Sequence, residues 1–261
     1  MSHGIAEAAA LLGAGFAAGT INTVVGSGTL ITFPTLLAFN YSPVLANVTN
    51  TVGLVPGVIS GIHGYRAELT GQRPRLLFLG TASLLGGLTG AFLLLTLPAN
   101  AFKTIVPVLI GLALVMVVVQ PRLAAWVARR QAARGARGGG GRAHASGGPV
   151  LWALIFCTGV YGGYFGAAQG VLLIGLLGIA FTDTLQRLNA AKNVLAALVN
   201  GIAAVLFIAV SHVAWGAAGL IAAGSIVGGQ VGARVGRKLP PVALRAVIVC
   251  VGIVALVKLL A

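Results

Sequence analysis

Acidic residues are almost missing from this sequence, because its 261 residues include only Glu7, Glu68 and Asp183. All three lie at or near the ends of apolar segments, so no helix interior offers a carboxylate to a cation. This scarcity disfavours a carrier of metal or sodium ions. It also disfavours an enzyme, because neither paired carboxylates, nor a Ser, His and Asp set, nor a metal-ligand cluster is visible. We therefore predict no catalytic residue, no metal site and no cofactor.

Cysteine is equally scarce, with Cys157 and Cys250 as the two examples. Each lies inside an apolar run, where neither a disulfide nor a thiolate metal site has partners. We interpret both as packing residues.

Apolar residues, in contrast, dominate the chain: 58% of it is hydrophobic and 8% is charged. Apolar stretches long enough to cross about 30 Å of hydrocarbon recur from residue 5 to residue 260, interrupted by one long polar segment. The first stretch lacks a basic start and carries Glu7, so we expect it to be retained rather than cleaved as a signal peptide. The sequence predicts an all-α polytopic membrane protein.

The charge that remains is mostly positive, with 17 Lys and Arg and a formal net charge of +14. Most of these bases lie in connecting segments, as expected for cytoplasmic loops next to an anionic leaflet. The lipid bilayer, and not nucleic acid, is the partner that this distribution indicates.

Two halves of the chain resemble each other. Residues 83–98, SLLGGLTGAFLLLTLP, align without gaps on residues 225–240, SIVGGQVGARVGRKLP. The same offset in residue number aligns Asn47 with Asn189, and a slightly different offset aligns Gly26 with Gly170. The chain therefore reads as a tandem duplication. The glycines within 83–98 and 225–240 have G-x-x-x-G spacing, which we assign to helix packing.

Each half is expected to contain a Gly-rich helical hairpin, re-entrant or broken, followed by three transmembrane helices. We divide the chain into a first repeat at 1–120, a basic Gly-rich cytoplasmic linker at 121–149 and a second repeat at 150–261. Basic residues occur at positions of the two copies that are not equivalent. The first copy has Arg66, Arg73 and Arg75, and the second has Arg234, Arg237 and Lys238. If bases mark the cytoplasmic side, the repeats are inverted and both termini are extracytoplasmic.

Polar residues near the hairpins are the candidate binding groups, since the bilayer penalises each one that lacks a cavity or partner. Broken helices add free backbone N–H groups and the positive ends of their dipoles, which suit an anion. The candidates in the first repeat are Asn22, Gly26, Ser27, Gly28, Thr29, Asn47, Asn50 and Thr51. Those in the second are Gln169, Gly170, Asn189, Lys192, Asn193 and Asn200. Close helix packing is the alternative role for the small residues, and Lys192 faces either the site or the cytoplasmic surface.

Nearly the whole chain, apart from the linker, resembles the TauE/SafE permeases. The resemblance rests on GFAAGTINTVVGSGTLITFPTLL at 15–37, NVTNTVGLVPGVISGIHGYRAEL at 47–69, GVYGGYFGAAQGVLLIGLLG at 159–178 and LNAAKNVLAALVNG at 188–201. It implies an inner-membrane, multi-pass permease that exports small sulfur oxyanions or organosulfonates. One departure is Ser27 and Thr29, where many members continue with Gly.

Three functions remain open at this point. The first is an anion exporter that works by alternating access, the second a channel or importer for a related oxyanion such as thiosulfate, and the third a noncatalytic membrane scaffold. The substrate, the direction, the coupling ion and assembly as a homo-oligomer are also left open.

Overall fold

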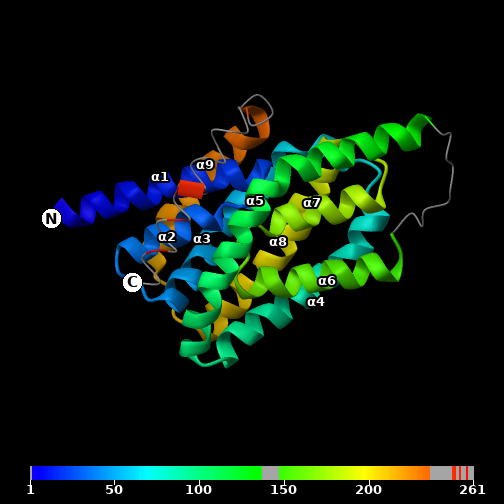
Figure 1. Cartoon of the computed structure of the whole chain (residues 1–261). Coiled ribbons are helices and arrows are strands. Elements are labelled where there is room, and N and C mark those ends of the chain that lie inside the picture. The colour runs from blue at the N-terminus through cyan, green and yellow to red at the C-terminus, as the bar shows by residue number, and fades with distance from the viewer. Residues whose placement is uncertain (1, 137–146, 236–248, 251–252, 254–256, 258–261) are drawn as a thin grey trace.

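The computed structural model describes residues 2–136, 147–235, 249–250, 253 and 257, and the regular secondary structure in these ranges is all helical, without a strand. The first half contains α1 (Ser2–Val24), α2 (Thr29–Ala38), α3 (Pro43–Gly64), a short 3₁₀ helix (Arg66–Leu69), α4 (Arg73–Thr96) and α5 (Ala99–Ala136). The second half contains α6 (Gly148–Tyr164), α7 (Gln169–Ala180), α8 (Leu185–Val210) and α9 (Trp215–Val235). Figure 1 shows these helices gathered in one bundle.

Six helical segments are long and apolar enough to cross a membrane: Gly4–Val24, Pro43–Gly64, Arg73–Thr96, Thr104–Leu123, Leu185–Val210 and Trp215–Arg234. The helices α2 and α7 are apolar but have 10 and 12 residues, which is too short to span about 30 Å. Each follows a longer helix, α1 or α6, after a short break. The expected all-α polytopic membrane architecture is therefore confirmed.

Each break between a long and a short helix contains a residue with left-handed backbone. Gly26, with φ of +86°, lies between α1 and α2, and Gly166, with φ of +74°, lies between α6 and α7. Glycine adopts this conformation without the steric cost that a side chain brings. The chain therefore reverses within a few residues, and the start of each short helix lies close to the end of the long one.

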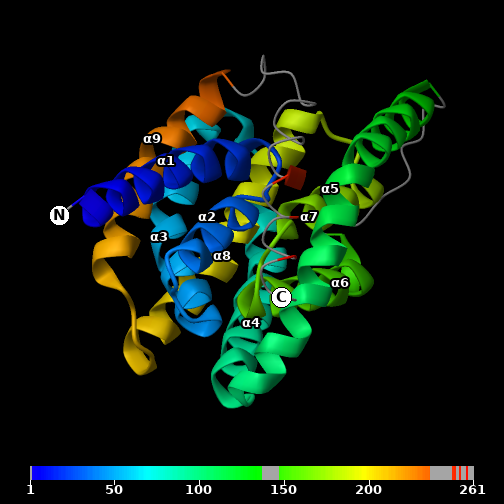
Figure 2. The same cartoon turned by 60° about the vertical axis from the view of Figure 1, so that its left-hand side comes forward.

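The two halves exchange their first helices. The helix α1 packs along α9, and α6 packs along α4 (Figure 1 and Figure 2). Glycine permits this close approach, because a Cβ at Gly15 would lie 2.9 Å from the Cα of Ile221 and one at Gly86 would lie 2.9 Å from the Cα of Gly159. The G-x-x-x-G glycines of α4 and α9 thus serve helix packing, as predicted.

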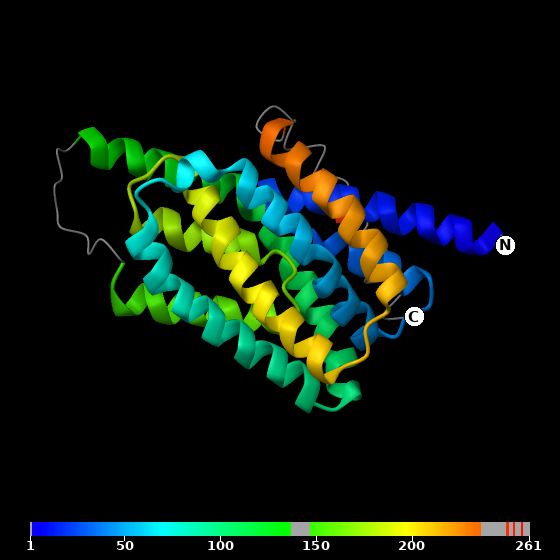
Figure 3. The same cartoon turned by 180° about the vertical axis from the view of Figure 1, so that it is seen from behind.

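The helices α3 and α8 run in opposite directions through the centre. Near the start of α3, the Thr49 hydroxyl accepts a hydrogen bond from Ala214 N, which follows α8, at 3.2 Å. Beyond the end of α3, Gln72 Nε2 donates to Arg187 O, at the start of α8, at 3.0 Å. Figure 3 shows the two helices side by side, with the start of α8 and the end of α3 at the same end of the bundle.

The segment after residue 120 differs from the expected linker. The helix α5 continues through Pro121 to Ala136, so residues 121–136 are helical rather than part of a flexible tract. The run LAAWVARRQAARGA is rich in Ala and Arg, which favour helix. Its end extends away from the bundle (Figure 1 and Figure 2). Arg237 and Lys238 lie outside the described residues, as does most of the last expected helix.

Candidate functional site

The break between α1 and α2 contacts the start of α7. Gly170 N, at the start of α7, donates a hydrogen bond to Gly26 O, between α1 and α2, at 3.2 Å. A Cβ on Gly170 would lie 2.5 Å from the Cα of Gly26, so neither position has room for a side chain. Two glycines predicted from equivalent positions of the repeat are therefore in direct contact, and they bring the starts of α2 and α7 together.

Three side chains from α8 converge on the end of α1. Asn189 Nδ2 donates to Thr23 O at 3.0 Å and Asn193 Nδ2 donates to the same oxygen at 3.4 Å. Lys192 Nζ donates to Asn22 O at 3.0 Å and to Thr23 O at 3.3 Å. The last carbonyls of a helix have no partner in the helix itself and carry the negative end of its dipole. The α8 side chains thus satisfy the C-terminal end of α1.

Lys192 points into the protein and is completely buried, with 0% of its surface exposed. The sequence left open whether it faces the site or the cytoplasmic surface, and the structure places it inside. Within the described residues, the ion pairs are those of Arg75 and Arg187 with Asp183, so Lys192 takes no part in one. Burying a cation costs free energy unless polar groups compensate it, and two carbonyls do so here.

A matching contact occurs in the other half. Asn47 Nδ2, from α3, donates to Tyr164 O, the last residue of α6, at 2.9 Å. A carbonyl oxygen can only accept a hydrogen bond, so the amide nitrogens of Asn47 and Asn189 must face these helix ends. The Oδ1 atoms of the two amides therefore point away from the helix ends. Both Oδ1 atoms are buried without a hydrogen-bond partner. The predicted pair thus leaves one free acceptor in each half.

Asn50, Thr29 and Thr51 form bonds within the first half. Asn50 Oδ1 accepts a short hydrogen bond from the Thr32 hydroxyl, and Asn50 Nδ2 donates to Thr29 Oγ1 at 3.3 Å. The Thr51 hydroxyl donates to Asn47 O at 2.9 Å. Both polar atoms of Asn50 are therefore engaged in holding α2 against α3. The Asn50 amide therefore uses its oxygen and one of its two N–H groups within the first half.

Free donors lie at the starts of the two short helices. Ser27 Oγ, just before α2, and Gln169 Nε2, the first residue of α7, are buried without a hydrogen-bond partner. Ser27 is 0% exposed and Gln169 is 2% exposed. Buried polar groups of this kind are uncommon, and each calls for a ligand or water. The backbone N–H groups at these helix starts add positive potential on the same side.

The remaining predicted residues lie at the edge of this cluster. Asn22 Oδ1 accepts from Gly28 N at 3.4 Å and so closes the first turn. Asn200 Nδ2 donates to Ala196 O on its own helix, α8, at 2.8 Å. The structure therefore groups the other predicted residues around the hairpin turns and leaves Asn200 further along α8.

Sequence reasoning missed three residues that accept or donate hydrogen bonds with the predicted ones. Thr23 and Tyr164 provide the helix-end carbonyls that accept from Asn189 and Asn47, and Thr32 binds Asn50. Tyr164 also carries a buried hydroxyl without a partner. Carbonyl acceptors have no signature in a sequence, since every residue has one. The ends of the two Gly-rich runs were the available signal for Thr23 and Tyr164.

The chemistry of this cluster suits an anion better than a metal. It offers the ammonium of Lys192, the hydroxyl of Ser27 and the amide of Gln169, all buried. In the part of the chain that the structure describes, no group of three or more His, Cys, Asp or Glu side chains could hold a metal ion. We therefore call Ser27, Asn47, Gln169, Asn189 and Lys192 the central polar cluster.

The helical bundle and the central polar cluster define a class, that of multi-pass membrane transporters. A family model described as "Sulfite exporter TauE/SafE" matches residues 11–259. This chain belongs to the TauE/SafE family, whose members are membrane transporters and not enzymes.

Named relatives agree with this assignment. The "Probable membrane transporter protein YfcA" of Escherichia coli K12 is 28% identical over 255 residues, which cover 93% of this chain and 86% of the relative. The "Probable membrane transporter protein" of Haemophilus influenzae is 25% identical over 240 residues, which cover 90% of this chain and 87% of the relative. No solved structure matches the chain.

Proposed function

We propose that this protein is a permease that moves a small sulfur-containing anion, such as sulfite or a sulfonate, outward across the inner membrane. The observation that carries the proposal is the fully buried ammonium of Lys192 at the end of α1, together with two buried donors without partners, Ser27 Oγ and Gln169 Nε2, which flank the contact between Gly26 and Gly170. The family match supports a small anion as the transported species.

The charge of Lys192 supports an anion more strongly than its hydrogen bonds do. A neutral amide is enough to satisfy a helix end, as Asn47 does for α6 and Asn189 for α1. A buried lysine is a costly addition to a helix end that already has neutral donors. This cost is explained if the ammonium attracts a negative ligand into the cluster. One fixed cation suits an anion of low charge.

The acceptors of the cluster add a finer expectation about the ligand. Asn47 Oδ1 and Asn189 Oδ1 are buried and without partners, so they favour a ligand that also carries a hydrogen-bond donor. A singly protonated oxyanion such as hydrogen sulfite has both acceptor oxygens and one donor. We propose this form as a preferred ligand.

Alternating access between two inverted repeats is the mechanism that the architecture supports. The equivalent helices α3 and α8 run in opposite directions, and α1 and α6 are exchanged between the halves. Inverted repeats place substrate sites near the midplane, where broken helices meet. The paired hairpins α1–α2 and α6–α7 are then the parts that rearrange.

The orientation that we propose follows the bases. Arg66, Arg73 and Arg187 are near the start of α8 and the end of α3, and we assign this end to the cytoplasm. Both termini are then extracytoplasmic, and the linker is cytoplasmic. An interior-negative potential drives an anion outward by about 2.3 kcal/mol per charge per 100 mV.

Flux measurements test the proposal. The purified protein is reconstituted in liposomes loaded with sulfite, and efflux is followed for the wild type, Ser27→Ala and Gln169→Leu. Each substitution removes one donor, which costs about 1–3 kcal/mol in binding to a charged group. We expect saturable efflux in the wild type and a loss of roughly tenfold in each variant.

Thr89→Ala is the matched control, because the exposed Thr89 hydroxyl donates to Leu85 O on its own helix. It should transport like the wild type. Absence of wild-type flux for sulfite, thiosulfate and a sulfonate would contradict the proposal and favour a scaffold. Flux that increases linearly with concentration, without saturation, would indicate a channel.

A further inference from the structure

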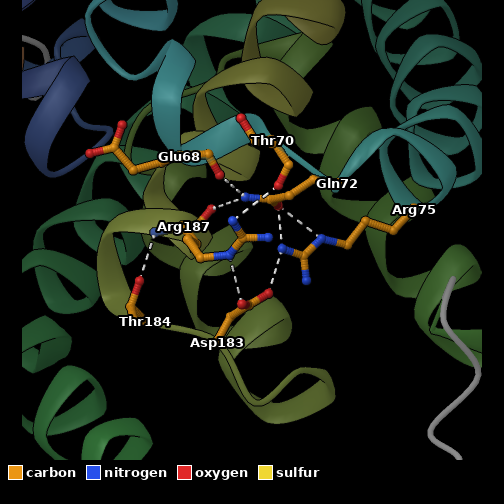
Figure 4. Close-up of polar contacts among 7 residues, drawn as sticks. All are labelled: Glu68, Thr70, Gln72, Arg75, Asp183, Thr184 and Arg187. Atoms are coloured by element: carbon orange, nitrogen blue, oxygen red, sulfur yellow. Dashed lines mark hydrogen bonds and ion pairs between the residues drawn. The ribbon is translucent and has the colours of Figure 1, made fainter.

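A polar cluster at one end of the bundle joins the two halves. Asp183, between α7 and α8, forms an ion pair with Arg75 of α4 at 2.6 Å and another with Arg187 of α8 at 2.8 Å. Figure 4 shows the Arg75 and Arg187 guanidinium groups next to each other, each joined to this carboxylate. One of the three acids of the chain is thus placed between residues of both repeats.

Gln72 connects the remaining groups of this cluster. Its Oε1 accepts from Arg75 Nε at 2.9 Å, and its Nε2 donates to Glu68 O at 2.6 Å and to Arg187 O at 3.0 Å. Arg187 also donates to Thr70 O at 3.0 Å. The segment 68–75 of the first half is therefore held to the start of α8 by several bonds, as Figure 4 shows.

Arg75 is buried although it is charged. It is 7% exposed, and its guanidinium carbon lies 4.6 Å from the centre of the Phe181 ring, which adds a cation–π contact. Arg75 and Asp183 therefore form a charged contact that is largely removed from solvent. Separating such a pair without new partners is unfavourable, because each ion is left with unsatisfied bonds.

The opposite end of the bundle lacks an equivalent among the described residues. There, the contact between halves is the neutral hydrogen bond from Ala214 N to Thr49 Oγ1. Tyr41, which follows α2, donates to Glu7 Oε1 at 2.8 Å, but both residues belong to the first half. Burial, followed by the Glu7 carboxylate, raises the pKa of the Tyr41 phenol, so this group stays neutral.

We propose that Arg75, Gln72, Asp183 and Arg187 form a latch that closes the cytoplasmic end of the path to the central polar cluster and opens during transport. Asp183 and Arg187 lie at the start of the helix that carries Asn189 and Lys192. Movement of this helix start away from segment 68–75 breaks the latch and exposes the cluster. The role of the latch in transport rests on the proposed function. Closure of the cytoplasmic end can be measured without an anion.

Cysteine labelling in oriented vesicles tests the latch. Cys157 and Cys250 are replaced by Ser, and Ser27→Cys provides one reporter in the central polar cluster. A membrane-impermeant maleimide is added from the cytoplasmic side or from the opposite side. We expect Asp183→Asn and Arg75→Gln each to increase the cytoplasmic labelling rate by about tenfold, a usual size for one coupling interaction. The rate from the opposite side should not rise.

Arg66→Gln is the matched control, since it removes a base from the same connecting region and Arg66 bonds to His63 in its own half. It should label like the reporter alone, and Asp183→Glu, which keeps a carboxylate, should label more slowly than Asp183→Asn. Equal increases from both sides would indicate general loosening and would overturn the latch, as would unchanged cytoplasmic labelling. Labelling as expected in a protein without anion flux would contradict the proposed function and leave the latch supported.

Discussion

The helices α3 and α8 correspond in the sequence alignment of the two halves but carry different chemistry at one residue. Asn50 in α3 corresponds to Lys192 in α8, and both side chains are buried. Asn50 binds Thr29 and Thr32 of its own half, whereas Lys192 reaches the end of α1 in the other half. Asn50 therefore holds α2 against α3 within the first half, and Lys192 places a positive charge between the halves.

This difference separates a structural role from a functional one. The neighbouring pair, Asn47 and Asn189, keeps the same contact in both halves, a helix end in the opposite repeat. Cross-repeat capping is thus a symmetric feature that neutral side chains provide. The charge occurs once, and the proposed anion site depends on it. Substitutions at these positions can test whether the two roles are separate.

Lys192→Met should have the largest effect on transport. It removes the buried cation and keeps a side chain of similar length. An ion pair at 4 Å contributes about 4 kcal/mol at an effective dielectric constant of 20, so we expect a loss of at least roughly a hundredfold in flux. The measurement is sulfite efflux from liposomes.

The stability of the same variant provides its control. Asn189 and Asn193 still donate to Thr23 O when Lys192 is replaced, and the cost of burying a charge disappears. The Tm in detergent should therefore stay close to that of the wild type. Lys192→Met protein that unfolds would show that the charge has a structural role, and folded protein that still transports at the wild-type rate would contradict the anion site.

Asn50→Ala should show the reverse pattern, with a larger effect on stability than on transport. The substitution removes the bonds to Thr29 and Thr32, although the Thr32 hydroxyl also bonds to Gly28 O at 3.3 Å. Hydrogen bonds between membrane helices contribute about 0.6 kcal/mol on average. We expect a loss of about 1 kcal/mol in unfolding free energy, measured by denaturation in detergent. Flux per folded molecule should fall less than in Lys192→Met; an equal fall would remove the distinction between the two positions.

The sequence was sufficient to predict the helical bundle and a Gly-rich break in each half, which the structure places at Gly26 and at Gly166. These features follow from apolar length and from glycine at positions that repeat. The direction of Lys192 could not be predicted, because it depends on where α1 from the other half ends. The helix at 121–136 was missed because glycine after residue 136 and proline at 121 suggested a linker along the whole segment.

Asn200→Ala should have the smallest effect, and it separates the site predicted from sequence from the site defined by contacts. The sequence includes Asn200 because it is a polar residue in an apolar helix, seven residues after Asn193. Seven residues advance about 10.5 Å along a helix, and Asn200 bonds to Ala196 O on α8 itself. We expect sulfite efflux within about threefold of the wild type, since even a hydrogen bond between membrane helices contributes only about 0.6 kcal/mol on average. A tenfold loss would instead extend the anion path along α8 toward Ala214, and the neutral end of the bundle would then contribute binding residues.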